Sequence, residues 1–130
     1  MRIGILGGTF NPIHKGHLKL AYQAKRKLKL DKIIFVPANI PPHKTQSYIL
    51  PAKERCKMVS LAITGFPFYE VSRYEIKKGG TSYSVTTLAY FRKKFGAAAK
   101  LFFLAGADSM SQLNTWKDIK KIIKLADFIV

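Results

Sequence analysis

The chain has 130 residues and a mass of 14.7 kDa, which is the size of a single domain with its own hydrophobic core. Hydrophobic residues make up 48% and charged residues 23% of the sequence, and these proportions exclude a disordered chain and a collagen-like repeat. Lysine and arginine number 23 against 7 aspartate and glutamate residues, so the formal net charge is +16 and polyanions are attracted to the protein.

Features that indicate cellular location favour the cytoplasm. No apolar run approaches the roughly 20 residues that span a bilayer, and the N-terminus lacks a secretory cleavage pattern. The single cysteine, Cys56, cannot form an internal disulfide, which fits a reducing compartment, and we expect it to be a buried thiol. We therefore expect a cytoplasmic protein with no membrane partner.

The lysines are scattered along the chain from Lys15 to Lys124 instead of forming one block. Scattered lysines between apolar positions are typical of amphipathic helices whose charged faces meet water. Solvated helix faces therefore explain most of the charge. The excess by itself does not distinguish phosphate-bearing ligands, nucleic acid and acidic surfaces.

The predicted elements alternate between strands and helices. Strands are predicted where short apolar runs end at glycine or proline, and helices where apolar residues recur three and four positions apart. A turn is predicted over 77–80, and Ser82 or Ser84 is expected to cap the helix after it. In chain order, we expect a strand over 2–6, a helix over 16–30, a strand over 33–36, a long loop to about Leu50, a helix over 51–64, a strand over 68–76, a helix around 85–95, a strand over 100–104, a helix over 116–125 and a strand over 128–130.

This alternation predicts the fold class: an α/β, Rossmann-like, doubly wound and mostly parallel sheet with helices on both faces. Ligands bind such sheets beyond the carboxyl ends of the strands, at the point where the winding reverses. Candidate site residues therefore lie in the segments that follow strands, namely 7–17, 39–44 and 106–108.

The segment 7–17 joins a buried strand to the start of a helix and has the composition of an anion-binding loop. Gly7 and Gly8 let the backbone approach a phosphate closely, and the following amides and the helix N-terminus supply hydrogen-bond donors. The segment lacks both the G-x-G-x-x-G spacing of dinucleotide folds and the Lys-Ser/Thr ending of the phosphate loop.

Two histidines close this segment, and their spacing predicts that they converge. His14 and His17 are three residues apart, so both project toward one point if the helix begins near Gly16. We expect a bound triphosphate to hold both rings as cations, although desolvation opposes that shift. For any one of these residues alone, a turn glycine or a surface histidine is the better interpretation. A zinc site is disfavoured because no Cys, Asp or Glu lies nearby.

Residues 7–17 read G-G-T-F-N-P-I-H-K-G-H, which is similar to the signature of the nucleotidyltransferase superfamily. Four further motifs resemble landmarks of the bacterial nicotinate-nucleotide adenylyltransferase family, and the resemblance as a whole runs from Arg2 to Val130. The four motifs are Pro41-Pro42-His43-Lys44, Ser82-Tyr83-Ser84, Gly106-Ala107-Asp108-Ser109 and Thr115-Trp116.

The resemblance implies transfer of AMP from ATP to nicotinate mononucleotide, with Mg²⁺ accompanying ATP and with nicotinate adenine dinucleotide and pyrophosphate as products. It implies direct attack on the α-phosphorus, without a covalent enzyme intermediate. His14 and His17 would be the catalytic residues. The ATP-binding set it implies is Gly7, Gly8, Thr9, Phe10, His14, His17, Gly106 and Asp108, and the mononucleotide-binding set is Asn39, Lys44, Tyr83, Ser84 and Trp116.

Several of these residues also have a structural interpretation. Trp116 could anchor the core, and Asp108 could cap a helix after the fourth strand. Lys44 could be a solvated lysine, and Tyr83 and Ser84 could serve only the turn and the cap. These alternatives remain open at the level of sequence.

The sequence departs from the family pattern in two places. Asn11 stands where the superfamily often has Asp, and the distal I-S-[ST]-x-x-[IV]-R motif of the family is absent. We therefore expect residues 1–130 to be a nucleotidyltransferase domain without the family's usual C-terminal part, either within a longer chain or as a shortened relative. Impaired ATP binding and an exposed sheet edge that favours a homo-oligomer would follow.

Two other functions remain as alternatives. One is a sibling nucleotidyltransferase such as phosphopantetheine adenylyltransferase. The other is a non-catalytic module that binds polyanions through the +16 charge. Nucleic acid is a disfavoured partner, because the basic residues lack the interleaved aromatic platform of single-strand binders.

Overall fold

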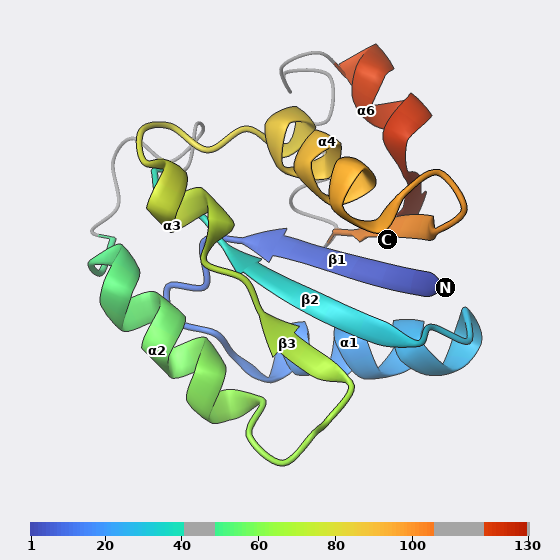
Figure 1. Cartoon of the computed structure of the whole chain (residues 1–130). Coiled ribbons are helices and arrows are strands. Elements are labelled where there is room, and N and C mark those ends of the chain that lie inside the picture. Colours follow the sequence, from blue (N-terminus) through green and yellow to red (C-terminus); the bar gives the residue numbers. More distant parts are fainter. Residues whose placement is uncertain (41–48, 106–118, 130) are drawn as a thin grey trace.

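The computed structural model describes residues 1–40, 49–105 and 119–129. Its centre is a five-stranded sheet in the order β3-β2-β1-β4-β5 (Figure 1). The predicted parallel α/β fold is confirmed, since each pair of neighbouring strands is parallel. The strands are β1 Arg2–Gly8, β2 Lys32–Pro37, β3 Tyr69–Val71, β4 Lys100–Leu104 and β5 Asp127–Ile129.

Helices cover both faces of this sheet, as the doubly wound fold requires. In Figure 1, α4 and α6 lie above the sheet and α1 and α2 lie below it. The short helix α3 is on the side of α4, because the Tyr74 ring stacks on the Tyr90 ring at 4.0 Å. The described helices are α1 Lys15–Lys27, α2 Ala52–Ala62, α3 Tyr74–Lys78, α4 Ser84–Phe95 and α6 Ile119–Leu125.

The two hydrophobic cores follow from the alternation of side chains along β1, since successive residues of a strand point to opposite faces. Ile5 packs in the core that contains Leu88 of α4. Leu6, the next residue, packs in the core that contains Ala21 of α1 and Val59 of α2. A run of apolar residues in a central strand therefore supplies both layers.

The strand order places the reversal of winding between β1 and β4. From β1 the chain proceeds through β2 to β3 at one edge, and it then returns past β1 to add β4 and β5 on the other side. The carboxyl ends of β1 and β4 therefore flank the position at which sheets of this kind bind ligands.

The strand predicted over 68–76 is wrong beyond Val71. β3 has only three residues, Tyr69–Val71, and 74–78 form the helix α3. The local sequence pattern was misleading because the side chains of Tyr74 and Glu75 are placed by contacts with α4, which a local pattern does not contain.

The capping prediction for α4 is also wrong. The N-cap residue is Tyr83, which makes no side-chain capping hydrogen bond, and Ser84 is the first residue of the helix. Ser82 Oγ instead accepts a hydrogen bond of 2.9 Å from Asn39 N–H, so this hydroxyl joins two loops across the carboxyl edge of the sheet.

The turn predicted over 77–80 is wrong at 77–78, which belong to α3, and the helix predicted over 16–30 ends at Lys27. Apart from β3, the other elements that the structure describes in full lie within two residues of their predicted bounds. Cys56 is a buried free thiol, and α6 and β5 are the described parts of the last predicted helix and strand. Residues 116–118 and Val130 lie outside the described residues. None of the helices in the described ranges is long and apolar enough to span a membrane.

Glu75 is a buried carboxyl group between α3 and α4, and Thr87 Oγ1 donates a hydrogen bond to its Oε2. Burial raises the pKa of Glu75 to about 7, against the smaller opposing effects of hydrogen bonds from Thr87 and Ser82 and of the charge on Lys78. The folded protein therefore keeps a proton on this group at pH values where the unfolded chain has lost it.

We expect the free energy of unfolding to fall between about pH 6 and pH 8, by about 1 kcal/mol more in the wild type than in Glu75→Gln. The stabilisation from protonated Glu75 is complete below pH 4.5, the ordinary pKa, and is lost as the pH rises through about 7. Urea unfolding at a series of pH values measures this difference. Identical pH profiles for the two proteins would contradict the assignment.

Candidate functional site

The loop that connects β1 to α1 lies at the carboxyl edge of the sheet. Gly7 and Gly8 pair with Val36 and Pro37, so β1 and β2 end side by side. Ala38 N–H then donates a hydrogen bond of 2.9 Å to Gly8 O. These contacts hold the glycine pair next to the reversal of winding, where a ligand is expected.

Packing within the protein does not require glycine at positions 7 and 8, because a Cβ atom would fit at both. A Cβ atom on Gly7 would lie 3.6 Å from Phe103 Cζ, and one on Gly8 would lie 3.5 Å from Phe10 Cζ. Both are ordinary van der Waals distances, so side chains could be accommodated at either position. Close approach of a ligand to the backbone explains the two glycines better than internal packing does.

His14 and His17 meet at the first turn of α1, so their predicted convergence is confirmed. His14 is the N-cap residue, and its Nδ1 accepts a hydrogen bond of 3.0 Å from Gly16 N–H. His14 N–H in turn donates a hydrogen bond of 3.0 Å to His17 Nδ1. The ring centroids are 3.9 Å apart. This is a reciprocal capping box in which both acceptors are imidazoles.

The capping bonds determine which ring nitrogen can reach a ligand. A nitrogen that accepts a hydrogen bond carries no proton, so each neutral ring has its proton on Nε2. Burial, with a smaller contribution from the charge of His14, lowers the pKa of His17 to about 4. His17 is therefore neutral at pH 7 in the free protein and presents Nε2–H as a donor.

The expectation that a bound triphosphate holds both rings as cations stays a prediction. An imidazolium carries protons on both nitrogens, so it would lose the Nδ1 acceptor that caps the helix. A bound ligand could therefore stabilise protonated His17 only if its attraction for the imidazolium outweighed the loss of the capping hydrogen bond and the cost of burying the charge.

Gly16 is required by this geometry. A Cβ atom at position 16 would lie 2.8 Å from Cε1 and 3.0 Å from Nδ1 of the His14 ring. Both distances are shorter than side chains normally tolerate, so any other residue would displace the ring. The glycine between the two histidines therefore allows the first ring to fold over the helix N-terminus.

Phe10 connects the loop to the core. Its φ of +51° lies in the left-handed region, which residues other than glycine rarely adopt. Its ring is buried, and the ring edge contacts His17 with the centroids 4.8 Å apart. The family resemblance implies that Phe10 binds ATP, and the structure adds a buried ring that supports His17 from the core side.

Asn11, which departs from the superfamily pattern, ties this loop to the start of α2. Its Oδ1 accepts a hydrogen bond of 2.9 Å from Leu50 N–H. An aspartate carboxylate could accept the same bond, so the exchange preserves the acceptor function and removes one negative charge.

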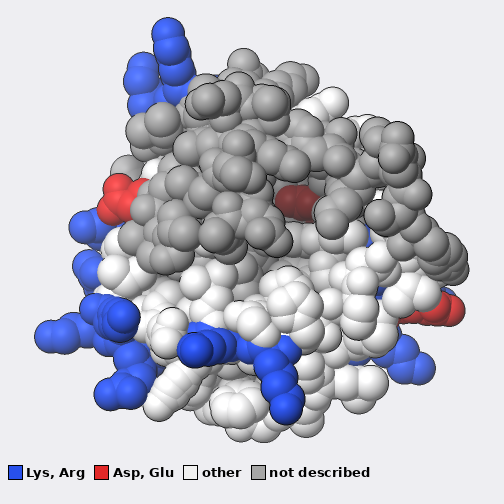
Figure 2. All heavy atoms as spheres, turned by 180° about the vertical axis from the view of Figure 1, so that it is seen from behind, with Lys and Arg blue, Asp and Glu red and all other residues white. Residues whose placement is uncertain are grey.

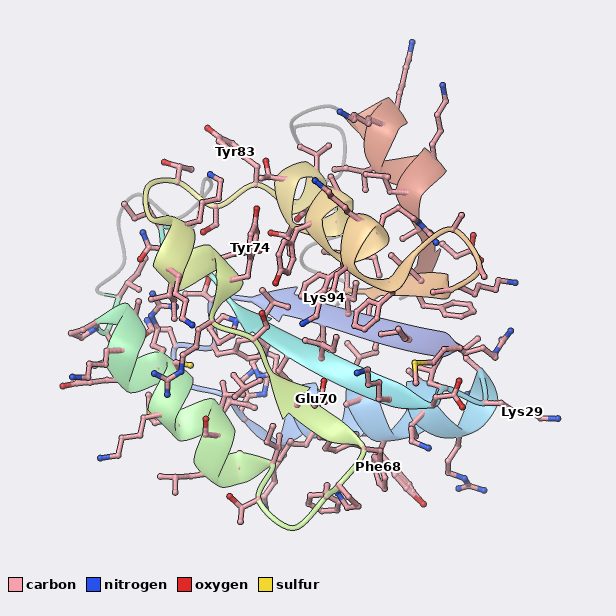
Figure 3. The ribbon with its side chains drawn as sticks, viewed as in Figure 1. Lys29, Phe68, Glu70, Tyr74, Tyr83 and Lys94 are labelled. Carbon is pink, nitrogen blue, oxygen red and sulfur yellow. The ribbon has the colours of Figure 1, made fainter. Side chains whose placement is uncertain are left out.

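The described residues that are predicted to bind the mononucleotide lie in two segments, one after β2 and one around the start of α4, and hydrogen bonds connect these segments. Asn39 Nδ2 donates a hydrogen bond of 2.9 Å to Gly80 O, and Ser82 N–H donates one of 2.9 Å to Ile40 O. These bonds place Asn39 beside the segment that contains Tyr83 and Ser84. Figure 3 shows Tyr83 at the start of α4.

The other predicted site residues, Lys44, Gly106, Asp108 and Trp116, lie outside the described residues. Their roles, and the structural alternatives for them, stay predictions.

Arg55 is a residue at this edge that sequence analysis missed. It is only 1% exposed, and its guanidinium group donates hydrogen bonds to Thr9 O and Ala38 O, both at 2.7 Å. The available signal was its place on the apolar side of the predicted helix, four residues before the buried Val59. An arginine in the position of a core residue indicates that buried hydrogen-bond acceptors surround its guanidinium group.

A cavity of about 610 Å³ lies between the outer face of α1 and the segment 66–69. Tyr22 and Phe66 are 49% and 48% exposed there, and Lys25 Nζ lies 4.5 Å from the Phe68 ring centroid. Figure 2, viewed from behind, shows Lys and Arg side chains spread over the lower part of the molecule. We call this cavity the α1 groove, and its lining residues are Lys15, Leu18, Lys19, Tyr22, Lys25, Arg26, Phe66, Phe68 and Tyr69.

The α1 groove contradicts one argument from the sequence. Basic residues were expected to lack an interleaved aromatic platform, but here four cationic side chains and four aromatic rings line one cavity. The platform was missed because Phe66, Phe68 and Tyr69 are far from α1 along the chain and approach it only in the fold.

No group of three or more His, Cys, Asp or Glu side chains converges within 1–40, 49–105 and 119–129. The two histidines of the site also use Nδ1 for the helix cap, and Mg²⁺ prefers oxygen ligands such as carboxylates. The described residues therefore do not form a resident Mg²⁺ site. A Mg²⁺ ion that accompanies a nucleotide would be held by the phosphates.

A model of the cytidylyltransferase-like family matches residues 5–130, in agreement with the fold and with the glycine–histidine motif of residues 7–17. The chain belongs to the cytidylyltransferase-like family. A curated relative from Clostridium beijerinckii, named probable nicotinate-nucleotide adenylyltransferase, is 48% identical over 132 residues, which cover 99% of this chain and 65% of the relative. A relative of the same name from a Thermoanaerobacter species is 43% identical over 129 residues, covering 99% of this chain and 61% of the relative.

A solved structure supports the same fold. The nicotinic acid mononucleotide adenylyltransferase of Plasmodium falciparum, complexed with APC, has a TM-score of 0.75 and 15% identity, covering 98% of this chain and 61% of that chain. At this identity the likeness establishes the fold alone. The family resemblance seen in the sequence is confirmed, and the chain spans 61% to 65% of the length of the two curated relatives described above.

We expect Gly16→Ala to displace the His14 ring from the helix N-terminus and to weaken binding of inorganic pyrophosphate. Loss of an N-cap hydrogen bond also lowers stability by about 1 kcal/mol. Isothermal titration and urea unfolding measure the two effects. The matched control is Gly65→Ala, because Gly65 lies beyond the end of α2 with φ of +93° and should change stability without changing pyrophosphate binding. Unaltered binding in Gly16→Ala would contradict the role of the ring.

Proposed function

We propose that residues 1–130 form the nucleotidyltransferase domain of an enzyme of NAD biosynthesis. The proposed reaction transfers AMP from ATP to nicotinate mononucleotide and yields nicotinate adenine dinucleotide and pyrophosphate. The observation that carries the proposal is the pair of capped imidazoles, His14 and His17, beside a glycine pair at the reversal of winding. The names of the curated relatives agree with this substrate pair.

In this reaction an oxygen of the mononucleotide phosphate attacks the α-phosphorus of ATP, and the bond to the β-phosphate breaks. The protein then needs no nucleophile of its own, since correct placement of two reactants contributes about 7 to 11 kcal/mol in general. His14 and His17 would donate Nε2–H bonds to the triphosphate and stabilise the charge that grows on the departing pyrophosphate. Backbone N–H groups from Gly8 to Phe10 would bind phosphate oxygens in the same way.

The second substrate would occupy the other side of the same edge. Asn39 and Lys44 would lie near its phosphate, while Tyr83, Ser84 and Trp116 would surround the pyridine ring. The hydrogen bonds of Asn39 to Ser82 and Gly80 support this division, because they bring the first of these segments beside the loop before α4. Gly106 and Asp108 would contact the ATP ribose.

The remaining parts of the proposal concern the surroundings of the reaction. Mg²⁺ would enter as the ion carried by ATP. The cytoplasm is the proposed location, in agreement with the free thiol of Cys56. A homo-oligomer formed through a sheet edge remains a proposal, and β3 and β5 are the strands at the two edges.

Release of pyrophosphate from ATP in the presence of nicotinate mononucleotide and Mg²⁺ tests the proposed reaction. His17→Asn is the informative variant, since the asparagine Oδ1 can accept the capping bond while the Nε2–H donor is lost. We expect kcat/KM to fall by about 100-fold or more in His17→Asn with stability close to that of the wild type. His17→Ala should lose both activity and the capping bond.

Other outcomes separate the alternatives. Faster pyrophosphate release with phosphopantetheine than with nicotinate mononucleotide would favour the sibling enzyme. Activity of His17→Asn close to that of the wild type would contradict the assigned mechanism. A wild-type chain that releases pyrophosphate with neither acceptor would contradict the proposed activity.

A second candidate function is binding of single-stranded nucleic acid, and the α1 groove is the observation that favours it. Bases stack on exposed aromatic rings in proteins that bind single strands, and the phosphates lie along cationic side chains. The groove offers both, with Tyr22 and Phe66 exposed and with no acidic residue in its lining. The net charge of +16 adds attraction over longer distances.

Fluorescence anisotropy with a labelled single-stranded oligonucleotide tests this candidate at several salt concentrations. We expect Tyr22→Ala and Phe66→Ala each to weaken binding by about tenfold, since stacking contributes about 1 to 3 kcal/mol per base. Lys93→Ala, an exposed lysine on α4 away from the groove, is the control and should have a small effect. Absence of binding near physiological salt would remove the candidate.

A further inference from the structure

Arg55 is a buried cation beneath both predicted substrate loops. It lies on the inner side of α2, and its guanidinium group donates hydrogen bonds to main-chain carbonyl groups of three separate segments. The acceptors are Thr9 O at 2.7 Å, Ala38 O at 2.7 Å, Asn39 O at 3.0 Å and Leu50 O at 2.7 Å. These carbonyls belong to the loop after β1, the segment after β2 and the residues just before α2.

The charge on Arg55 has no anionic partner in the described part of the chain. The ion pairs found there are Lys32 with Glu70 and Lys100 with Asp127. Four carbonyl acceptors satisfy most of the five guanidinium N–H groups but leave the positive charge uncompensated. Burial of an uncompensated charge costs free energy, and the hydrogen bonds to the four carbonyl groups offset that cost. The place of Arg55 at the ligand edge suggests a role beyond folding.

The orientation of one peptide group shows how Arg55 acts on the backbone. In a trans peptide the C=O and the following N–H point in opposite directions. The Ala38–Asn39 peptide follows this rule, since Ala38 O accepts from Arg55 on one side and Asn39 N–H donates to Ser82 Oγ on the other.

The same rule applies to the Thr9–Phe10 peptide, which is also trans. Thr9 O points to Arg55, so Phe10 N–H points away from Arg55. No described residue accepts a hydrogen bond from this N–H group. The left-handed φ of Phe10 is compatible with a backbone concavity in which successive N–H groups face an anion.

We propose that Arg55 is a positioning residue for phosphate binding: by holding the Thr9 carbonyl it turns Phe10 N–H toward the phosphate and strengthens it as a donor. The inference rests on the proposed function, because it needs a phosphate at this edge. The same side chain also holds Ala38 O and Asn39 O, so it couples the geometry of the ATP side to that of the acceptor side.

Lysine cannot replace arginine in this role. The four acceptors surround a planar group that donates from three nitrogen atoms. A lysine ammonium group has three donors on one atom and a tetrahedral geometry, so it keeps the charge but cannot hold all four carbonyls. Arg55→Lys therefore separates the effect of charge from that of orientation.

The chain also contains a matched control. Arg92 of α4 donates hydrogen bonds to Ala99 O, to Gly96 O at 3.2 Å and to Leu125 O at 2.8 Å. Ala99 directly precedes β4, so this second group lies at the amino edge of the sheet, opposite the ligand edge. Substitution of Arg92 removes carbonyl contacts of the same type without touching the predicted phosphate loop.

The experiment compares Arg55→Lys, Arg55→Gln, Arg92→Lys and Arg92→Gln by isothermal titration with inorganic pyrophosphate and by thermal unfolding. We expect both Gln variants to lower Tm, but only Arg55→Gln to raise the Kd for pyrophosphate, by about tenfold or more. Arg55→Lys should raise it by a smaller factor, and the Arg92 variants should stay within about twofold of the wild type. The amide signal of Phe10 in ¹H–¹⁵N spectra should shift with pyrophosphate in the wild type and shift less in Arg55→Gln.

The outcomes distinguish this inference from the proposed function. Absence of pyrophosphate binding by the wild type would overturn both. If the wild type binds pyrophosphate and both Arg55→Lys and Arg55→Gln bind it with the wild-type Kd, the role of Arg55 alone is overturned. An equal loss of affinity in the Arg92 variants would overturn it as well. If Arg55→Gln does not fold, Arg55→Lys carries the test through the Phe10 signal. A signal that responds as in the wild type would overturn the inference.

Discussion

Two reciprocal hydrogen bonds at the start of α1 determine the geometry on which the site depends. Every helix N-terminus has unpaired N–H groups and a partial positive charge, and Ser, Asp or Asn usually satisfies them. Here His14 and His17 do so through Nδ1, and the first turn contains no acidic residue. The helix is capped without placing a carboxylate where an anionic ligand would bind. The ring nitrogens left for the ligand are donors.

At the same edge of the sheet, the loop after β2 is held by a buried cation through its carbonyl groups and by a hydroxyl group through an N–H group. Arg55 holds the carbonyl oxygens of Ala38 and Asn39, while Ser82 accepts the Asn39 N–H. The buried Glu75 is hydrogen-bonded to Ser82 and to Thr87 of α4. The loops after β1 and β2 are thus connected through buried polar groups, and fully satisfied networks of this kind restrict loops to one arrangement.

The large positive charge has two different structural contexts. Most lysines of α1 lie on its outer face, as the scattered pattern predicted, but several of them line the α1 groove together with aromatic rings of the segment 66–69. Arg55 is the opposite case, because its charge is buried and directed at backbone carbonyls. Net charge therefore says little about function until the surroundings of each cation are known.

The sequence alone determined the parallel α/β fold, because alternating strand and helix patterns require crossover connections between parallel strands. It also determined the glycine loop and the convergence of His14 and His17, because these depend on residues close in the chain. The tertiary structure alone decided the end of β3 at Val71, the loss of Ser82 as a cap and the burial of Arg55. In each case the partner is distant in sequence: α4 for the residues after β3, Asn39 for Ser82, and the ends of two strands for Arg55. Local periodicity reports which face of an element is apolar, but it carries no information on which distant carbonyl or hydroxyl group will meet a polar side chain.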